Sequence, residues 1–305
     1  MQIVRHEIID FTKYMRAPAD AANVKPASTY HDEVVRLFRT KPADTGVPLP
    51  WNYTEDKVRI RPGELSIWSG TNGHGKSILL SMIVLWQMAY HQKICLASME
   101  MEPKKTLYRM ARQFVGGVSG SDVDLQKFSD WTGGRLWMYD QVGTIKFDRI
   151  VALIRYCVEE LKINQFVIDS LMKCGIGVDD YNAQKSFVDE LSTLAKDTGI
   201  HIHLVAHSRK KETEHGQIGK FDIKGASEIT DMADNVFTLW RNKKREAEEA
   251  ETPGSGKGPG ALLVCDKQRH GEWEGKIGLF FHPKSMQFHK TEGSQRGYVV
   301  PFTDR

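Results

Sequence analysis

The chain has 305 residues and a formal net charge of +3, from 42 lysines and arginines against 39 aspartates and glutamates. Hydrophobic residues make up 40% and charged residues 27%, values that exclude a disordered or fibrous protein and allow one large or two ordinary globular domains. A charge of +3 does not by itself predict nucleic-acid binding, so a site for a polyanion would require a local concentration of charge.

The N-terminal fifty residues divide into three predicted segments. Residues 1–29 lack clear periodicity and are expected to form an extended arm. Residues 30–39 (YHDEVVRLFR) predict a short amphipathic helix, which packs either on its own domain or on a neighbouring subunit. The Pro-rich residues 41–50 break this helix and predict a linker. We therefore expect an arm over 1–29, a linker helix and Pro-rich linker over 30–50, and one α/β domain over 51–305.

Apolar strand patterns alternate with helical patterns through most of that domain. Strands are predicted at 65–70, 93–98, 136–139, 165–169 and 201–206, and helices at 75–91, 103–115, 148–161 and 182–198. Further strands at 235–241, 261–267, 278–282 and 286–289 follow without intervening helices. The charged, then Gly/Pro-rich residues 243–260 predict a mobile loop. The fold class predicted is α/β, a doubly wound, mainly parallel sheet with antiparallel strands at the C-terminal edge.

The cysteines are few and widely spaced, at Cys95, Cys157, Cys174 and Cys265. Their spacing fits neither a metal site nor a disulfide framework, which favours a reduced, intracellular setting. Charges interrupt the N-terminus where a secretory signal needs an apolar core, and the longest apolar-rich stretch, 78–90, is too short to span a bilayer. A soluble, cytoplasmic protein is expected.

The strongest motif is a phosphate-binding loop of the form G-x-x-x-x-G-K-[S/T], which lies between a predicted strand and a predicted helix. It is formed by Gly70, Thr71, Asn72, Gly73, His74, Gly75, Lys76 and Ser77. Glycines allow the backbone amides to face phosphate oxygens, while the lysine reaches the β- and γ-phosphates and the serine ligates Mg²⁺. The motif predicts that the protein binds ATP, or another NTP or dNTP, together with Mg²⁺.

Two carboxylates follow later strands of the same predicted sheet. Asp169 ends the apolar strand FVID and is predicted to hold Mg²⁺ directly or through water. Glu100 follows the strand that ends at Ser98, where it could polarise an attacking water. An alternative is that Glu100 or Glu102 only charges the first turn of the next helix.

Three histidines, His201, His203 and His207, share a face if their segment is extended, a spacing that could suggest a metal site. No cysteine or carboxylate pattern supports such a site. We therefore do not predict a metal site there.

The order of motifs resembles one known family. After the phosphate loop come S-M-E-M, V-I-D-S, L-V-A-H-S-R-K, K-G-A-S-E-I-T-D-M-A-D-N-V and D-K-Q-R-H-G. This order resembles the RecA-like motor domain of hexameric replicative DNA helicases, the DnaB group, over residues 50–290. It is most similar to phage primase–helicases and mitochondrial Twinkle, in which a histidine replaces the glutamine of DnaB after the fourth strand.

The resemblance implies roles for matching residues. Glu100 would be the catalytic base, His207 the sensor of the γ-phosphate, and Arg241 an arginine near the nucleotide base. Arg269 would be the arginine finger and Lys267 its companion, both offered to the nucleotide of an adjacent subunit. The segment that lines the central channel in the family, and so contacts DNA, matches Arg209, Lys210, Lys211, Lys220, Lys224 and Gly225.

The resemblance also implies a function and its partners. We expect a homo-oligomeric ring, a hexamer in the family, that hydrolyses NTP and moves 5′ to 3′ on single-stranded DNA to unwind duplex. Primase, polymerase and a loader are possible partners, in a bacterial or phage-infected cell or an organellar matrix; no membrane is expected. Two rivals remain open, a RecA-type recombinase filament and an assembly or signalling ATPase that never touches DNA.

One departure from the family is the short N-terminal part. Family members carry a primase, a zinc-binding module or a helical collar ahead of the motor, and here about 50 residues precede it. The chain is therefore either a helicase-only protein or the C-terminal part of a longer one.

Overall fold

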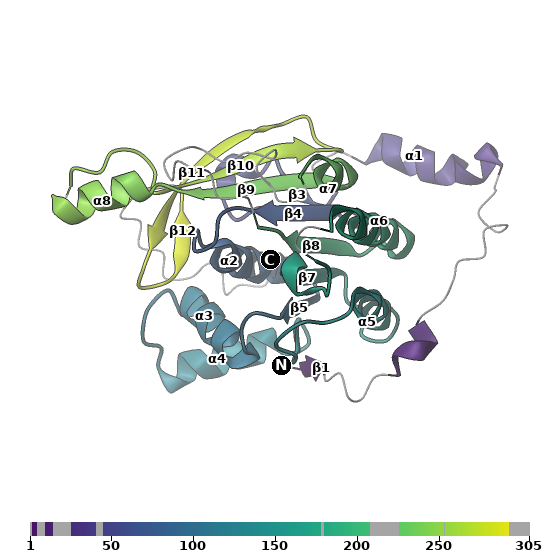
Figure 1. Ribbon diagram of the computed structural model, residues 1–305, viewed down its shortest axis with the longest axis horizontal. Helices are drawn as coiled ribbons and strands as arrows, with labels where there is room; N and C mark the ends of the chain where they lie inside the picture. Colours follow the sequence, from purple (N-terminus) through teal and green to yellow (C-terminus); the bar gives the residue numbers. More distant parts are fainter. Residues whose placement is uncertain are drawn as a thin grey trace.

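The computed structural model describes residues 2–4, 10–14, 26–40, 45–177, 180–207, 226–252 and 254–292. The strands of these ranges are β1 (Gln2–Val4), β2 (Val47–Pro48), β3 (Arg59–Ile60), β4 (Leu65–Ser69), β5 (Ile94–Ser98), β6 (Leu136–Tyr139), β7 (Gln165–Asp169), β8 (His201–Val205), β9 (Asn235–Arg241), β10 (Ala261–Gln268), β11 (Gly275–His282) and β12 (Gln287–His289). Ten of them form one sheet in the order β1-β6-β5-β7-β8-β4-β9-β10-β11-β12, while β2 pairs with β3 (Figure 1).

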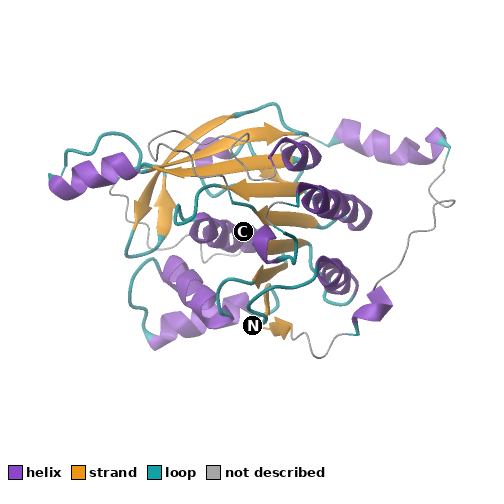
Figure 2. Cartoon of the chain, viewed as in Figure 1, coloured by secondary structure: helices purple, strands orange, loops and turns teal. Residues whose placement is uncertain are grey.

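Helices cover the two faces of this sheet (Figure 2). The helices of the described ranges are α1 (His31–Arg39), α2 (Lys76–Ala89), α3 (Pro103–Val115), α4 (Asp122–Thr132), α5 (Phe147–Glu159), α6 (Tyr181–Thr198), α7 (Ala226–Met232) and α8 (Lys243–Glu251), of which α2 to α7 pack on the sheet. One apolar core joins the sheet to α5, α6 and α7, and a second joins its other face to α2, α3 and α4. No helix in the described ranges is long and apolar enough to cross a membrane.

The central strands are apolar along their whole length because both of their faces are covered. Every residue of β4, β5, β6, β7 and β8 is buried, and alternate residues of each strand enter opposite cores. These strands and β9 run parallel, whereas β10, β11 and β12 pair antiparallel. The predicted α/β class, with its antiparallel C-terminal edge, is confirmed.

Several elements were not predicted from the sequence. The predicted loop at 243–260 contains α8, which begins after Asn242, whose side chain accepts a hydrogen bond from the Arg245 amide. Helix α4 was missed although Ser121 and Asp124 form a capping box at its start. The predicted arm contains strand β1, which extends the sheet beside β6.

Helix α1 lies away from the sheet in Figure 1 and buries none of its residues. Its apolar face is solvent-exposed in the single chain, with relative exposures of 45% for Val34, 70% for Leu37 and 88% for Phe38. Packing of α1 on its own domain is therefore not observed among the described residues. An exposed apolar face of this kind favours association with another surface.

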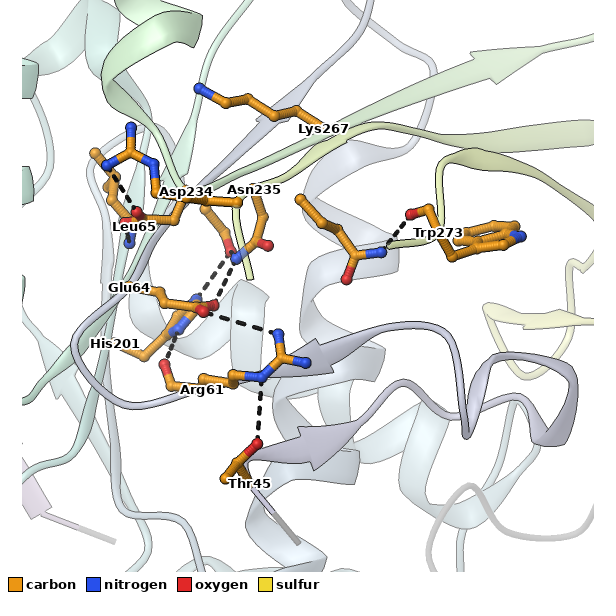
Figure 3. A network of polar contacts seen from close by, with 12 residues as sticks. Thr45, Arg61, Glu64, Leu65, His201, Asp234, Asn235, Lys267 and Trp273 are labelled. Carbon is orange, nitrogen blue, oxygen red and sulfur yellow. Dashed lines mark hydrogen bonds and ion pairs between the residues drawn. The ribbon is translucent and has the colours of Figure 1, made fainter. Parts of the chain in front are cut away.

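A directional chain of hydrogen bonds crosses the buried sheet. The Trp68 indole donates to His203 Nδ1 over 3.1 Å, which leaves the proton of the neutral imidazole on Nε2, facing Gln165 Oε1 at 3.2 Å. The Gln165 amide donates in turn to Gln87 Oε1. The neighbouring His201 places Nδ1 2.6 Å from the Arg61 carbonyl (Figure 3). Its Nε2 lies 3.0 Å from Ser66 Oγ.

These contacts hold both imidazoles neutral. Burial lowers the pKa of His201 from 6.5 to about 4, and burial together with the nearby His201 lowers the pKa of His203 well below its ordinary value. In the unfolded chain both groups take up protons near pH 6.5, whereas the folded state excludes these protons. The contribution of these histidines to stability therefore falls as the pH drops from about 6.5 towards 4.

Replacing His203 with glutamine is expected to lower the free energy of unfolding at pH 7 by about 1–3 kcal/mol, because buried polar partners lose their contacts. It should also remove about 1.4 kcal/mol per pH unit of the pH dependence between 6.5 and 4. Urea titrations at several pH values measure both effects. His31→Gln, in the exposed helix α1, is the matched control, and an unchanged pH slope in His203→Gln would contradict the assignment.

Candidate nucleotide-binding site

The phosphate-binding loop lies between β4 and α2, as predicted. Gly70 adopts φ +147°, and a Cβ atom there would lie 2.4 Å from the Leu239 carbonyl oxygen on β9, so no larger residue fits. Gly75 caps α2 with φ +90°, a conformation that residues with a side chain rarely adopt. The amides of the first turn of α2 have no partners inside the helix and give its start a positive potential. The loop therefore has the geometry of an anion site.

Lys76 is the first residue of α2 and is 7% exposed. Its ammonium donates to the carbonyls of Gly70 at 2.8 Å and Thr71 at 3.2 Å, and lies 3.2 Å from His207 Nδ1. Burial lowers the pKa of Lys76 to about 8, although the carboxylates of Asp169 and Glu100 oppose the shift. Because carbonyl dipoles compensate a buried ammonium only in part, an added phosphate would stabilise its charge.

Asp169 and Ser77 provide oxygen atoms next to the loop. Asp169 ends β7 and is 8% exposed, and burial raises the pKa of its carboxyl, while a hydrogen bond from the Ser77 hydroxyl opposes this rise. A carboxylate and a hydroxyl are hard oxygen donors of the kind that Mg²⁺ prefers. Their juxtaposition fits a magnesium ion bound beside nucleotide phosphates.

Glu100 lies at the centre of a second group of contacts. Its Oε1 accepts a hydrogen bond from Ser170 Oγ at 2.8 Å and lies 3.5 Å from His207 Nε2. Contact with His207, supported by the Ser170 hydrogen bond, lowers the pKa of Glu100 to about 2. Glu102, by contrast, is paired with Lys104 and Lys105 at the surface. A carboxylate that stays ionised at neutral pH and faces a cavity can orient and polarise a water molecule.

The imidazole of His207 joins these two groups. Because the charged ammonium of Lys76 can only donate, Nδ1 of His207 is the acceptor and Nε2 carries the proton. Nε2 lies 3.3 Å from Ser170 Oγ and 3.5 Å from Glu100 Oε1. His207 therefore contacts both Lys76 and Glu100.

Lys76, Ser77, Glu100 and His207 line a cavity of about 730 Å³ at the carboxyl ends of the parallel strands, and Asp169 adjoins it through its hydrogen bond with Ser77. The lining residues come from the loop and the start of α2, from the segments that follow β5, β6, β7 and β8, and from α3. The lining comprises Asn72, Gly73, Gly75, Lys76, Ser77, Ile78, Met99, Glu100, Arg109, Val142, Gly143, Met172, Lys173 and His207.

Arg109 was not predicted from the sequence. It lies on α3, half-buried, and burial lowers the pKa of its guanidinium while Asp169 favours its charged form. It lies three residues after Thr106 and next to Met110, both of which are buried. The sequence signal for Arg109 is its position near buried residues of α3, the helix that follows Glu100.

A second hollow of about 510 Å³ adjoins the other side of the loop and includes Arg241. The Arg241 guanidinium donates to the Gly73 carbonyl at 3.3 Å and pairs with Glu246 of α8. Phe281 and Phe288 add aromatic surface to this hollow. An arginine next to aromatic rings suits the planar base of a nucleotide.

Lys267 and Arg269, by contrast, lie away from both hollows. Lys267 lies near the end of β10 and Arg269 directly follows the strand; β10 is antiparallel to β9, and Gln268 pairs with Asn235 at the start of β9. The phosphate loop follows the opposite end of β4, a strand parallel to β9. The structure therefore separates these two cations from the loop of their own chain.

The predicted DNA contacts Arg209, Lys210, Lys211, Lys220, Lys224 and Gly225 all lie outside the described residues. No cluster of three or more histidine, cysteine, aspartate or glutamate residues suited to a metal is found in the described part of the chain. His201 and His203 instead use their ring nitrogens in the buried network.

Comparisons with known proteins agree with this geometry. The chain is 22% identical over 238 residues to the chloroplastic/mitochondrial Twinkle homolog protein of Arabidopsis thaliana, an alignment that covers 72% of this chain. The aligned region covers 34% of the plant protein, so the chain spans about a third of that relative's length.

Two solved structures share the fold at 15% sequence identity. The first is described as an ATPase domain and matches with a TM-score of 0.71, over 88% of this chain and all of that one. The second, a DnaB-like replicative helicase described together with its interactions with primase, matches with a TM-score of 0.68 over 88% of this chain and 69% of its own.

The family model for the DnaB-like helicase C-terminal domain matches residues 57–290, which include both hollows, Lys267 and Arg269. The match extends over most of the chain and agrees with the RecA-like arrangement of the sheet. The protein therefore belongs to the DnaB-like helicase C-terminal domain family.

Proposed function

We propose that this protein is a ring-forming replicative helicase motor that hydrolyses ATP or another NTP with Mg²⁺, translocates on single-stranded DNA and unwinds duplex. The observation that carries the proposal is the cluster of Lys76, Asp169, Glu100 and His207 around one cavity, together with Arg269 at the other end of the sheet. The 5′ to 3′ direction and the hexameric state are proposed from family resemblance.

In this proposal each residue of the cavity acts on a different part of the nucleotide. Lys76 leaves the loop carbonyls to bind the phosphates, and Ser77 and Asp169 hold the metal, which neutralises phosphate charge. Glu100 orients the attacking water, and His207 passes the state of the γ-phosphate from Lys76 to Glu100. Arg241 lies against the base. Arg269 and Lys267 complete the site of the neighbouring subunit.

The ring interface is proposed to include α1. Residues 30–50 would act as a linker, with the face formed by Val34, Leu37 and Phe38 docked on the next motor domain (51–305). The exposure of this face in the single chain supports that arrangement. Single-stranded DNA would pass along the basic residues of the segment 209–225, and primase, polymerase and a loader are proposed as further partners.

Replacing Glu100 with glutamine keeps the size of the side chain but removes its capacity to accept a proton. We expect kcat for NTP hydrolysis to fall by about 10²–10⁴-fold, with little change in KM. Glu102→Gln, which removes the exposed carboxylate two residues away, should leave both values within about twofold of wild type. Equal losses in the two variants would contradict the assignment of Glu100 as the base.

The basic segment tests the DNA-dependent part of the proposal. On a forked duplex with a 5′ single-stranded tail, the wild-type protein should displace one strand in the presence of NTP. Lys210→Ala/Lys211→Ala should lose DNA-stimulated hydrolysis and unwinding but keep basal hydrolysis, because phosphate contacts are removed. The control Lys104→Ala/Lys105→Ala removes two exposed lysines of α3. Unimpaired unwinding by the first variant would exclude this segment as the DNA contact.

The role of α1 in assembly can be tested by Leu37→Ser/Phe38→Ser. Loss of two exposed apolar anchors should weaken the ring, so light scattering after size-exclusion chromatography should show monomers or small oligomers. Val123→Ser, at a residue of α4 that is 62% exposed, is the matched control and should assemble normally. Full-size rings formed by the double variant would show that α1 is not an interface anchor.

A further inference from the structure

Arg269 is held in place by its own chain, at the end of the sheet opposite to the phosphate loop. Its backbone amide donates to the Asp234 carbonyl at 2.8 Å, and its guanidinium donates to the Asp231 carbonyl at 3.1 Å. A second guanidinium nitrogen lies 3.3 Å from the Asp234 carboxylate. The Arg269 side chain is 37% exposed, so the group is anchored but accessible.

The anchoring carboxylate of Asp234 is itself rigidly placed. Asp234 is 1% exposed, and its Oδ2 accepts a hydrogen bond from the Leu65 amide at 2.9 Å. The Asp234 amide donates back to the Leu65 carbonyl at 2.9 Å, which fixes the residue to the start of β4 (Figure 3). Its other oxygen, Oδ1, faces Arg269 and has no hydrogen-bond partner of ideal geometry among the described residues.

The two carboxylate oxygens of Asp234 have different partners, the Leu65 amide for Oδ2 and the Arg269 guanidinium for Oδ1. A buried carboxylate is stable only if its charge is compensated. Here the compensating cation is the partly exposed guanidinium of Arg269. The same contact restricts the rotamers of a long side chain that would otherwise sample many directions. Lys267 is held on the same support, because its ammonium donates to the carbonyls of Thr230 and Asp231 at the end of α7.

We propose that Asp234 is a positioning residue for Arg269, which pre-orients the guanidinium that enters the nucleotide site of the adjacent subunit. The inference rests on the proposed function, because it requires Arg269 to act in trans. Asp234 would not touch the nucleotide. It acts through Arg269, and its connection to Leu65 fixes the arginine to the strand that leads to the phosphate loop of the same chain.

Asp234→Asn should retain an oxygen for the Leu65 amide but lose the charge that orients Arg269. We expect kcat to fall by about 10²–10³-fold, with KM for the nucleotide changed less than twofold. The Asp234→Asn/Arg269→Ala double variant should be no slower than Arg269→Ala alone, since Asp234 acts only by positioning Arg269. Asp231→Asn is the matched control, because its side chain is exposed and its contacts with Arg269 and Lys267 come from the backbone.

Mixed oligomers separate positioning from a structural effect. Lys76→Ala subunits lack a phosphate site but offer an intact arginine, so mixing them with Asp234→Asn subunits should restore part of the turnover. Mixing Asp234→Asn with Arg269→Ala should restore none, because both lack an ordered arginine. The reverse pattern would overturn the proposal, since it would show that Asp234 supports only the phosphate loop of its own chain.

Two further outcomes are informative. If Lys76→Ala and Arg269→Ala subunits form mixed oligomers but do not complement each other, the shared site of the proposed function is wrong and this inference falls with it. If Asp234→Asn does not fold, the same mixtures are measured with Asp234→Glu, which keeps the charge but displaces it by one methylene. Complementation of that variant by Arg269→Ala, and not by Lys76→Ala, would also overturn the proposal.

Discussion

The charge of Lys76 is the constraint on which the site depends. A buried ammonium requires compensation, and in the single chain it receives this from two loop carbonyls and from the carboxylates of Asp169 and Glu100. The lowered pKa shows that the compensation is incomplete. His207 accepts from the same ammonium and lies against Glu100, so movement of Lys76 towards a phosphate alters the surroundings of the carboxylate. In the proposed mechanism, nucleotide binding and the state of Glu100 would thereby be linked through one imidazole.

The sheet determines which groups can meet within one chain. Parallel strands bring Lys76, Asp169, Glu100 and His207 to one end, whereas the antiparallel return of β10 carries Arg269 to the other. A single chain would thus supply one half of each of two sites in the proposed ring. In the proposed ring, the charge that develops on the phosphates in one subunit would be stabilised by the arginine of the next. Hydrolysis would then require contact between subunits, because each active site would need a residue of the adjacent subunit.

The sequence placed the phosphate loop, Asp169 and Glu100 at strand ends, because each is a local pattern, and parallel strands bring such ends together. Arg109 was not predicted as a site residue, because the local sequence pattern does not show which end of an amphipathic helix faces the cavity. Helix α8 was wrongly predicted as a loop: it has no apolar stripe, and its start depends on the Asn242 cap and its Lys244–Glu248 pair. The Asp234–Arg269 pair joins distant segments, so only the fold reveals it.

In the proposed motor, the nucleotide lies between two subunits. This arrangement is tested most directly by electron cryo-microscopy of the protein with a nonhydrolysable NTP, Mg²⁺ and single-stranded DNA. We expect a closed ring in which the phosphates contact Lys76 of one subunit and the Arg269 guanidinium of its neighbour. Nucleotide bound at Lys76, with every Arg269 remote from phosphate in a well-resolved assembly, would contradict it.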